Sequence, residues 1–161
     1  MSFSVRRFDV ADADAVAALW AHAFPDDPAR NEPHGMIARK VARDPDLFWV
    51  ACAPGPDAGA GSASDPPGSG VGGSDVIGAL MAGYDGVRGW LYHLAVSDQH
   101  RRRGVASALV ERALAELREL GCVKVNLQVR ETNGQVRAFY ESLGWSEDRS
   151  TSLGRVIGDA P

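Results

Sequence analysis

The most constraining feature of this 161-residue sequence is an arginine-rich turn placed between a strand pattern and a helix pattern. Residues 90–96 read WLYHLAV, and three consecutive arginines follow at 101–103. Gly104 then opens an apolar-striped helical pattern that continues to about Leu120. The first N–H groups of a helix have no partner within the helix, and the helix dipole favours negative charge there. Because guanidiniums add charged donors and glycine permits close backbone approach, this order of elements predicts a diphosphate-binding site.

The rest of the chain alternates between strand and helix patterns and predicts one α/β domain over residues 1–161. Strands are expected at 3–8, 47–53, 76–84, 89–96 and 123–129, with one or two closing strands at 145–153 and 154–157. Helices are expected at 12–24, about 31–43, 104–120 and 132–143. Asp12 is the expected N-cap of the first helix, Gly121 the stop of the third, and Asp85-Gly86 the turn of a hairpin. The predicted order is β-α-α-β-β-β-α-β-α-β, with an optional last strand, as a mixed sheet covered by helices on both faces.

Residues 54–75 differ in composition from the rest of the chain. They consist almost entirely of Gly, Pro, Ser, Ala and Asp and contain no aromatic residue. Such a segment buries too little surface to offset the entropy lost on ordering. We interpret it as a flexible loop inserted between two strands, and its role is either a tolerated hairpin insertion or a substrate lid.

Composition and charge exclude several classes of protein. The net charge of −4 and the pI near 5.5 disfavour nucleic acid as a partner. The sequence contains neither an apolar run long enough to span a bilayer nor a secretion signal, so we expect a cytoplasmic protein without membrane contact. Cys52 and Cys122 are expected to be free thiols, and the spacing of the four histidines indicates no metal site. The acidic excess is compatible with a cationic acceptor such as an amine.

The spacing Arg101-x-x-Gly104-x-Ala106 resembles the acyl-CoA pyrophosphate loop of the GCN5-related N-acetyltransferase (GNAT) family. The strand pattern before it occupies the place of the family's fourth strand. Downstream, residues 133–145 read NGQVRAFYESLGW, which is similar to the family's ending of Asn, Ala-x-x-Tyr and Gly-aromatic. The resemblance covers roughly residues 88–146, whereas the first half matches in layout only. It implies a GNAT-type, mostly antiparallel sheet of six to seven strands with about four helices, and acetyl-CoA as cofactor with no metal.

The resemblance also implies which residues hold the cofactor. In the family, a bulge on the fourth strand separates it from the fifth, and the freed backbone edge pairs with the pantetheine arm. An N–H near Leu94 would then stabilise the oxyanion of the thioester. The cofactor-binding residues implied in this chain are Leu94, Ala95, Val96, Arg101, Arg102, Arg103, Gly104, Val105, Ala106, Ser107, Asn133 and Tyr140.

The proton chemistry of acetyl transfer needs an acid for the departing thiolate and a base for the amine. Tyr140 matches the family's usual acid, and a phenol with a pKa of about 10 is protonated at neutral pH; its alternative role is core packing. Some relatives carry a glutamate base at the position of Trp90, so this chain departs from that pattern. His93 is a possible base acting through water. The residues expected to line the acceptor side are Trp20, Phe24, Asp26, Asp27 and Trp49.

The sequence therefore predicts an acetyl-CoA-dependent N-acetyltransferase that acts directly on a primary amine in a ternary complex. The acceptor is a small molecule, a protein N-terminus or a lysine, and the protein is a monomer or homodimer. The alternative is a non-catalytic module that binds or senses acyl-CoA. RNA binding is disfavoured, because the chain has no basic surface interleaved with aromatic residues.

Overall fold

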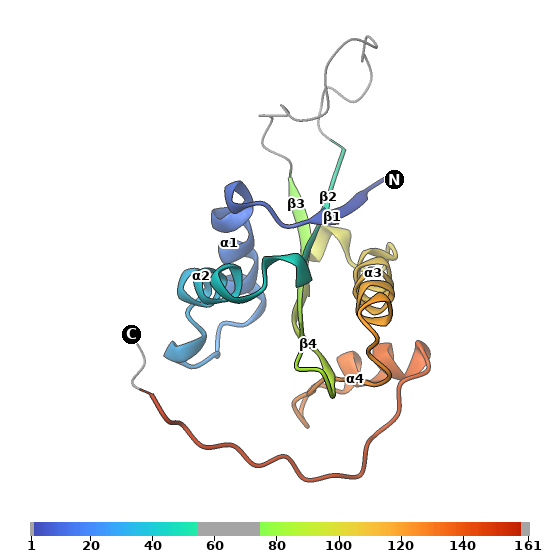
Figure 1. Cartoon of the computed structure of the whole chain (residues 1–161). Coiled ribbons are helices and arrows are strands. Elements are labelled where there is room, and N and C mark those ends of the chain that lie inside the picture. Colours follow the sequence, from blue (N-terminus) through green and yellow to red (C-terminus); the bar gives the residue numbers. More distant parts are fainter. Residues whose placement is uncertain (1, 55–74, 159–161) are drawn as a thin grey trace.

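A computed structural model describes residues 2–54 and 75–158 of the chain. The predicted insertion at 54–75 lies outside these ranges except for its two end residues. The described residues form a central sheet with helices on both faces (Figure 1). One face carries α1 (Ala13–Ala23) and α2 (Pro33–Arg43), and the other carries α3 (Val105–Glu119) and α4 (Gly134–Ser142). These four helices and their order confirm the sequence prediction.

The sheet contains five strands in the spatial order β1-β2-β3-β4-β5. Neighbouring strands from β1 to β4 pair antiparallel, and β5 pairs parallel with β4. The strands are β1 (Ser4–Arg7), β2 (Phe48–Cys52), β3 (Val76–Tyr84), β4 (Gly89–Val96) and β5 (Val125–Asn126). Short 3₁₀ turns lie at Val10–Asp12, Ala29–Asn31, Pro45–Leu47 and Asp98–His100.

The apolar run of β2 explains why it lies inside the sheet. All five of its residues are buried, as expected for a strand covered on both faces. Trp49 joins the core between the sheet and α3, whereas Phe48 and Val50 join the core under α1 and α2. The two faces of the sheet therefore have separate hydrophobic cores. Cys52 and Cys122 are both free thiols, as the sequence predicted.

The structure confirms two predicted features, the hairpin turn at Asp85-Gly86 and the helix stop at Gly121. Asp85 Oδ1 accepts hydrogen bonds from the backbone N–H of Val87 and of Arg88, both at 2.7 Å, and Gly86 has φ +89°. These contacts close the hairpin between β3 and β4. Gly121 adopts φ +84° directly after α3, where a left-handed residue ends the helix.

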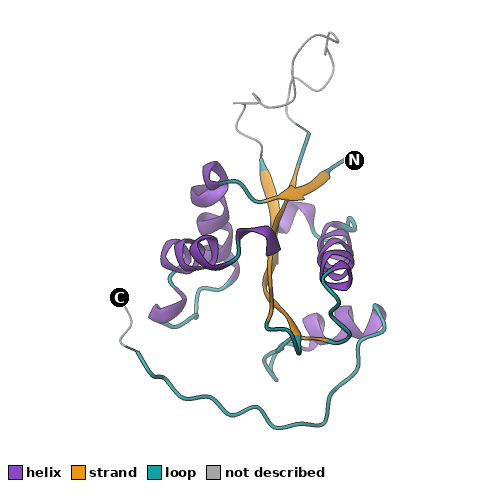
Figure 2. Cartoon of the chain, in the orientation of Figure 1, coloured by secondary structure: helices purple, strands orange, loops and turns teal. Residues whose placement is uncertain are grey.

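The closing strands at 145–153 and 154–157 are not formed, which corrects the predicted count of six to seven strands. Residues 143–158 are drawn as loop in Figure 2. The predicted strand at 123–129 is also reduced to its central pair, Val125–Asn126. For the residues after Trp145, the physical reason is the scarcity of apolar side chains that pack against a core. Leu153 and Ile157 are 91% and 94% exposed, so burial contributes little to strand pairing there.

Asp12 occupies the N-cap position of α1, but its carboxylate does not cap the helix. It binds Arg6 through two hydrogen bonds of 2.7 and 2.8 Å, and only 7% of the side chain is exposed. Burial alone would raise the pKa of Asp12. The hydrogen bonds from Arg6 and from the Asp9 backbone outweigh this effect, so the pKa lies below its usual value. Asp9 instead caps the preceding 3₁₀ turn, accepting from Ala11 N–H at 2.9 Å.

We expect Asp12→Ala to lower the free energy of unfolding at pH 7 by about 1–3 kcal/mol, because the two hydrogen bonds between Arg6 and the buried carboxylate are lost. The pKa of Asp12 is lower in the folded chain than in the unfolded chain. The contribution of Asp12 to the free energy of unfolding is therefore complete above a pH of about 4. It disappears as the pH falls through the pKa that Asp12 has in the folded chain. Urea denaturation at pH 7 and pH 3 measures this, with the fully exposed Asp14→Ala as control. If Asp12→Ala lowered the free energy of unfolding by the same amount at pH 7 and at pH 3, the prediction would be contradicted.

Candidate functional site

A bulge in β4 shapes the centre of the site. Ala95 pairs with Ala79, whereas Tyr92 pairs with Met81, so one residue of β3 faces two residues of β4. The extra residue lies at His93 and Leu94. His93 has φ +51°, a left-handed conformation that is uncommon outside glycine. Such a bulge bends its strand and redirects the backbone groups that follow it.

The bulge leaves an open backbone edge on the second half of β4. Ser97 N–H donates to the Ile77 carbonyl at 2.8 Å, so the backbone polar groups of Ser97 point toward β3. In an antiparallel pair, successive residues of a strand point their N–H and C=O groups to opposite sides. The N–H and C=O groups of Val96 and Leu94 therefore point away from β3. On that outer side, β5 pairs only with Gly89 and Trp90 among the described residues. Arg101 Nε donates to the Val96 carbonyl at 3.5 Å, so this edge offers the Val96 N–H and the polar groups of Leu94 to an extended chain of amides, as in strand addition.

The arginine turn follows directly and ends at the first turn of α3. Gly104 is the N-cap of α3 with φ +81°, and no side chain caps the helix there. The first backbone bond of the helix runs from Ala108 N–H to the Gly104 carbonyl at 3.0 Å, which leaves the N–H groups of residues 105–107 without partners inside the helix. These are the donors that the sequence predicted for a diphosphate. A Cβ on Gly104 would meet no atom within 4 Å, so the positive φ, and not crowding, is what favours glycine.

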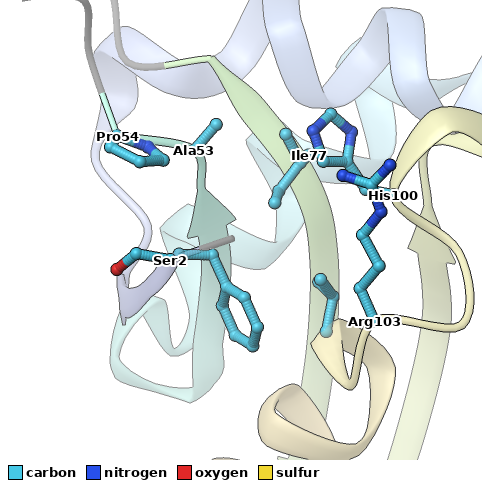
Figure 3. Close-up of a pocket in the computed structure, with 8 residues that line it drawn as sticks. Ser2, Ala53, Pro54, Ile77, His100 and Arg103 are labelled. Carbon is cyan, nitrogen blue, oxygen red and sulfur yellow. The ribbon is translucent and has the colours of Figure 1, made fainter.

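The three arginines of the turn are exposed. Arg101 pairs with Asp98 at 2.9 Å. Arg102 has φ +58°, a second left-handed residue in the turn. Arg103 extends toward His100, and both side chains line a cavity of about 240 Å³ (Figure 3). This cavity lies between the turn and the strands β1 to β3. The cavity is lined by Ser2, Phe3, Ala53, Pro54, Ile77, His100, Arg103 and Val105.

Tyr140 lies on α4 and packs into the core on the α3 side of the sheet. It is 7% exposed, and its ring contacts Phe139 and Trp145 with centroid distances of 5.0 and 5.5 Å. Burial raises the pKa of Tyr140 to about 12, so the phenol keeps its proton throughout the neutral range. Asn133 caps α4, because its Oδ1 accepts from Val136 N–H at 3.2 Å.

The predicted acceptor-side residues separate into two groups. Phe24 and Asp27 meet His93: the Phe24 and His93 ring centroids are 5.1 Å apart, and Asp27 Oδ2 lies 3.0 Å from His93 Nε2. Asp26 is exposed next to them. Trp20 and Trp49 are 1% and 0% exposed, and their assignment to the acceptor side stays a prediction. Their large apolar side chains are core residues, because burying them is more favourable than leaving them in contact with water.

Arg130, which no sequence pattern indicated, donates from Nη2 to Asp27 Oδ1 at 2.7 Å. The two residues are 103 positions apart, and no local pattern pairs them. Within residues 2–54 and 75–158, no group of three or more His, Cys, Asp or Glu side chains could hold a metal ion. No helix in that part of the chain has both the length and the apolar character needed to cross a membrane.

Comparison with solved structures identifies related folds. The Ard1 protein of Thermoplasma volcanium superimposes with a TM-score of 0.69 and 24% identity, covering 89% of this chain and 82% of its own. AAC(6')-Iy, in complex with a bisubstrate analogue of CoA, superimposes with a TM-score of 0.70 and 16% identity, covering 98% of this chain and 100% of its own. At these identities the likeness concerns the fold.

Comparison of sequences establishes the family. The acetyltransferase (GNAT) family model matches residues 13–145. An acetyltransferase of Pectobacterium atrosepticum is 37% identical over 158 residues, which cover 96% of each chain. An acetyltransferase of Yersinia enterocolitica is 35% identical over 155 residues, covering 95% of this chain and 94% of the relative. The chain therefore belongs to the GNAT family and is an acetyltransferase.

Proposed function

We propose that this protein transfers an acetyl group from acetyl-CoA directly to a primary amine within a ternary complex. The observation that carries the proposal is the continuity between the open edge of β4 and the uncapped start of α3. An extended amide chain bound along Leu94 and Val96 would lead to the N–H groups at residues 105–107, which have no partner inside the helix and where a diphosphate fits. The chemistry of these donors matches the pantetheine arm and the diphosphate of CoA.

This chain has a candidate residue for each proton transfer, namely removal of a proton from the amine and protonation of the departing thiolate. When bound, acetyl-CoA supplies an acetyl group activated as a thioester. The Leu94 N–H would donate to the carbonyl oxygen of that group as negative charge develops on it. His93 would take a proton from the acceptor ammonium, and Tyr140 Oη would donate one to the departing sulfur. Asn133 contributes by capping α4, the helix that carries Tyr140.

The test is release of free thiol from acetyl-CoA in the presence of a panel of amines. The panel contains polyamines, an aminoglycoside, peptides with free N-termini and a lysine peptide with a blocked N-terminus. Mass spectrometry of the products identifies an acetylated amine, and calorimetry measures CoA binding separately. Binding of CoA without turnover on any amine would favour an acyl-CoA sensor. Absence of CoA binding by folded protein would overturn the proposal.

We expect Arg101→Ala and Arg102→Ala each to weaken CoA binding about five- to tenfold, because each removes one charge-assisted contact while the backbone donors stay in place. Because salt screens charges, the loss of CoA affinity relative to the wild type should be smaller at high salt. Calorimetry at low and high KCl measures the effect. Arg112→Ala is the matched control, since Arg112 lies further along α3 and pairs with Glu116 at 3.1 Å. Equal affinity of both turn variants and the wild type at low salt would refute the prediction.

A further inference from the structure

Three segments far apart in the sequence meet at Asp27, in the connection between α1 and α2. Asp27 Oδ2 lies 3.0 Å from His93 Nε2 on the β4 bulge, and Asp27 Oδ1 accepts from Arg130 at 2.7 Å. Asn31 Nδ2 also donates to Oδ2 at 3.3 Å. The Asp27 and His93 side chains are only 16% and 17% exposed. Both carboxylate oxygens are thus engaged inside the protein, which leaves Asp27 poorly placed to bind the ammonium of an acceptor directly.

The ring of His93 is held on several sides. Its backbone is in the left-handed region, a conformation that persists only where the surroundings enforce it. On the α1 side, the ring lies 5.4 Å from the ring of Trp20 and 5.1 Å from that of Phe24, measured between centroids. Trp20 is fully buried and itself stacks on Phe48, so packing holds the aromatic side of the His93 environment in place. Asp27 supplies the polar contact that completes the enclosure.

The contact with Asp27 also selects one tautomer of His93. An ionised carboxylate accepts hydrogen bonds but donates none, so the ring proton belongs on Nε2. The lone pair then lies on Nδ1, to which the described residues make no hydrogen bond. Asp27 contacts the ring through its carboxylate, Arg130 pairs with the other carboxylate oxygen, and the rings of Trp20 and Phe24 lie beside the imidazole.

From these contacts we infer that Asp27 is a positioning residue, which fixes the tautomer and orientation of His93 so that Nδ1 receives the proton of the acceptor amine. This inference rests on the proposed function, since it deepens the role of His93 there. The proton leaves the ammonium nitrogen, directly or through one water, and forms an N–H bond with Nδ1. The resulting imidazolium keeps its Nε2–H on Asp27, whose negative charge stabilises it. Arg130 holds the other oxygen of Asp27 and so orients the carboxylate.

The tautomer can be measured without any substrate. In ¹⁵N spectra of the imidazole nitrogens, we expect His93 at neutral pH to be in the Nε2–H form when the ring is uncharged. The spectrum of His93→Gln identifies its signals among the four histidines of the chain. In Asp27→Asn, the carbonyl oxygen is expected to stay on Arg130, which can only donate, so the NH2 group faces His93 Nε2 and the Nδ1–H tautomer should predominate. A wild-type His93 that is mainly in the Nδ1–H form would overturn the inference.

Kinetics with an amine that the enzyme accepts provide the second test. We expect Asp27→Asn to lower kcat about tenfold, with KM and CoA affinity changed less than about twofold, because a misoriented base slows proton transfer and not binding. The same substitution in the His93→Gln background should cause no further loss, because Asp27 acts through His93. Arg130→Lys should retain more activity than Arg130→Gln, since lysine keeps the charge.

A second Asp–His pair on the surface provides the control. His34 Nε2 lies 3.1 Å from Asp14 Oδ1, and both side chains are exposed, so Asp14→Asn removes a comparable contact outside the site. Equal losses from Asp27→Asn with and without His93, or kinetics indistinguishable from those of Asp14→Asn, would overturn the inference. Absence of turnover by the wild type would instead count against the proposed function. The tautomer measurement would still decide whether Asp27 controls His93.

Discussion

Tyr140→Phe should lower kcat by about a hundredfold while CoA affinity stays within about twofold. The substitution removes only the hydroxyl that is proposed to protonate the departing thiolate, and general acid catalysis contributes at least this factor in many enzymes. The phenylalanine ring keeps the packing against Phe139 and Trp145. Because burial raises the pKa of Tyr140 to about 12, its phenol stays protonated, and the loss should be constant from pH 6 to pH 9.

Steady-state rates of thiol release, with CoA binding measured by calorimetry, check this prediction. Tyr84→Phe is the matched control, because the Tyr84 hydroxyl donates to the Gly86 carbonyl in the hairpin. The raised pKa also predicts a difference in stability. The folded chain favours the protonated phenol, so the wild type should lose stability as the pH rises above about 10, and Tyr140→Phe should lose less. Turnover of Tyr140→Phe within threefold of the wild type at every pH would contradict the acid assignment.

Trp49→Ala should lower the free energy of unfolding by about 3–5 kcal/mol. Trp49 is 0% exposed and belongs to the core with Leu80 and Leu109, so truncation would leave a cavity between the sheet and α3. The sequence predicted Trp49 on the acceptor side, and a core role and an acceptor-side role predict different results. A core residue affects stability and leaves KM for the amine unchanged in the molecules that remain folded.

Urea denaturation together with the KM for the amine separates these roles. Trp49→Phe is the matched variant. It keeps an aromatic ring and removes the indole Nε1, a buried donor without a hydrogen-bond partner in the described part of the chain. We expect it to lose less stability than the alanine variant, because the cavity is smaller and no unpaired donor remains. A Trp49→Ala protein that unfolds within about 1 kcal/mol of the wild type and shows a raised KM would support the acceptor role instead.

Local patterns in the sequence predicted the elements from β1 to α4 and the arginine turn. Apolar periodicity, the turn at Asp85, and the glycines at 104 and 121 each act over a few residues, so they can be recognised without knowledge of the fold. The same reasoning failed for residues 145–157, which have extended sequence character but no partner strand among the described residues. A strand forms only when pairing and burial occur together, and neither can be read from one segment alone.

The contacts at His93 depend on parts of the chain that meet only after folding. The sequence indicated a histidine near the expected thioester position. It did not indicate the left-handed conformation at the bulge, the burial of Trp49 or the contact of Asp27 with Arg130. Helix and strand periodicity, caps and turns depend on neighbouring residues, so the amino-acid order alone set the course of the elements and the position of the arginine turn. Strand register and the pairing of distant charges depend on how sheet and helices pack as a whole, and therefore the tertiary structure decided which side chains surround the proposed base.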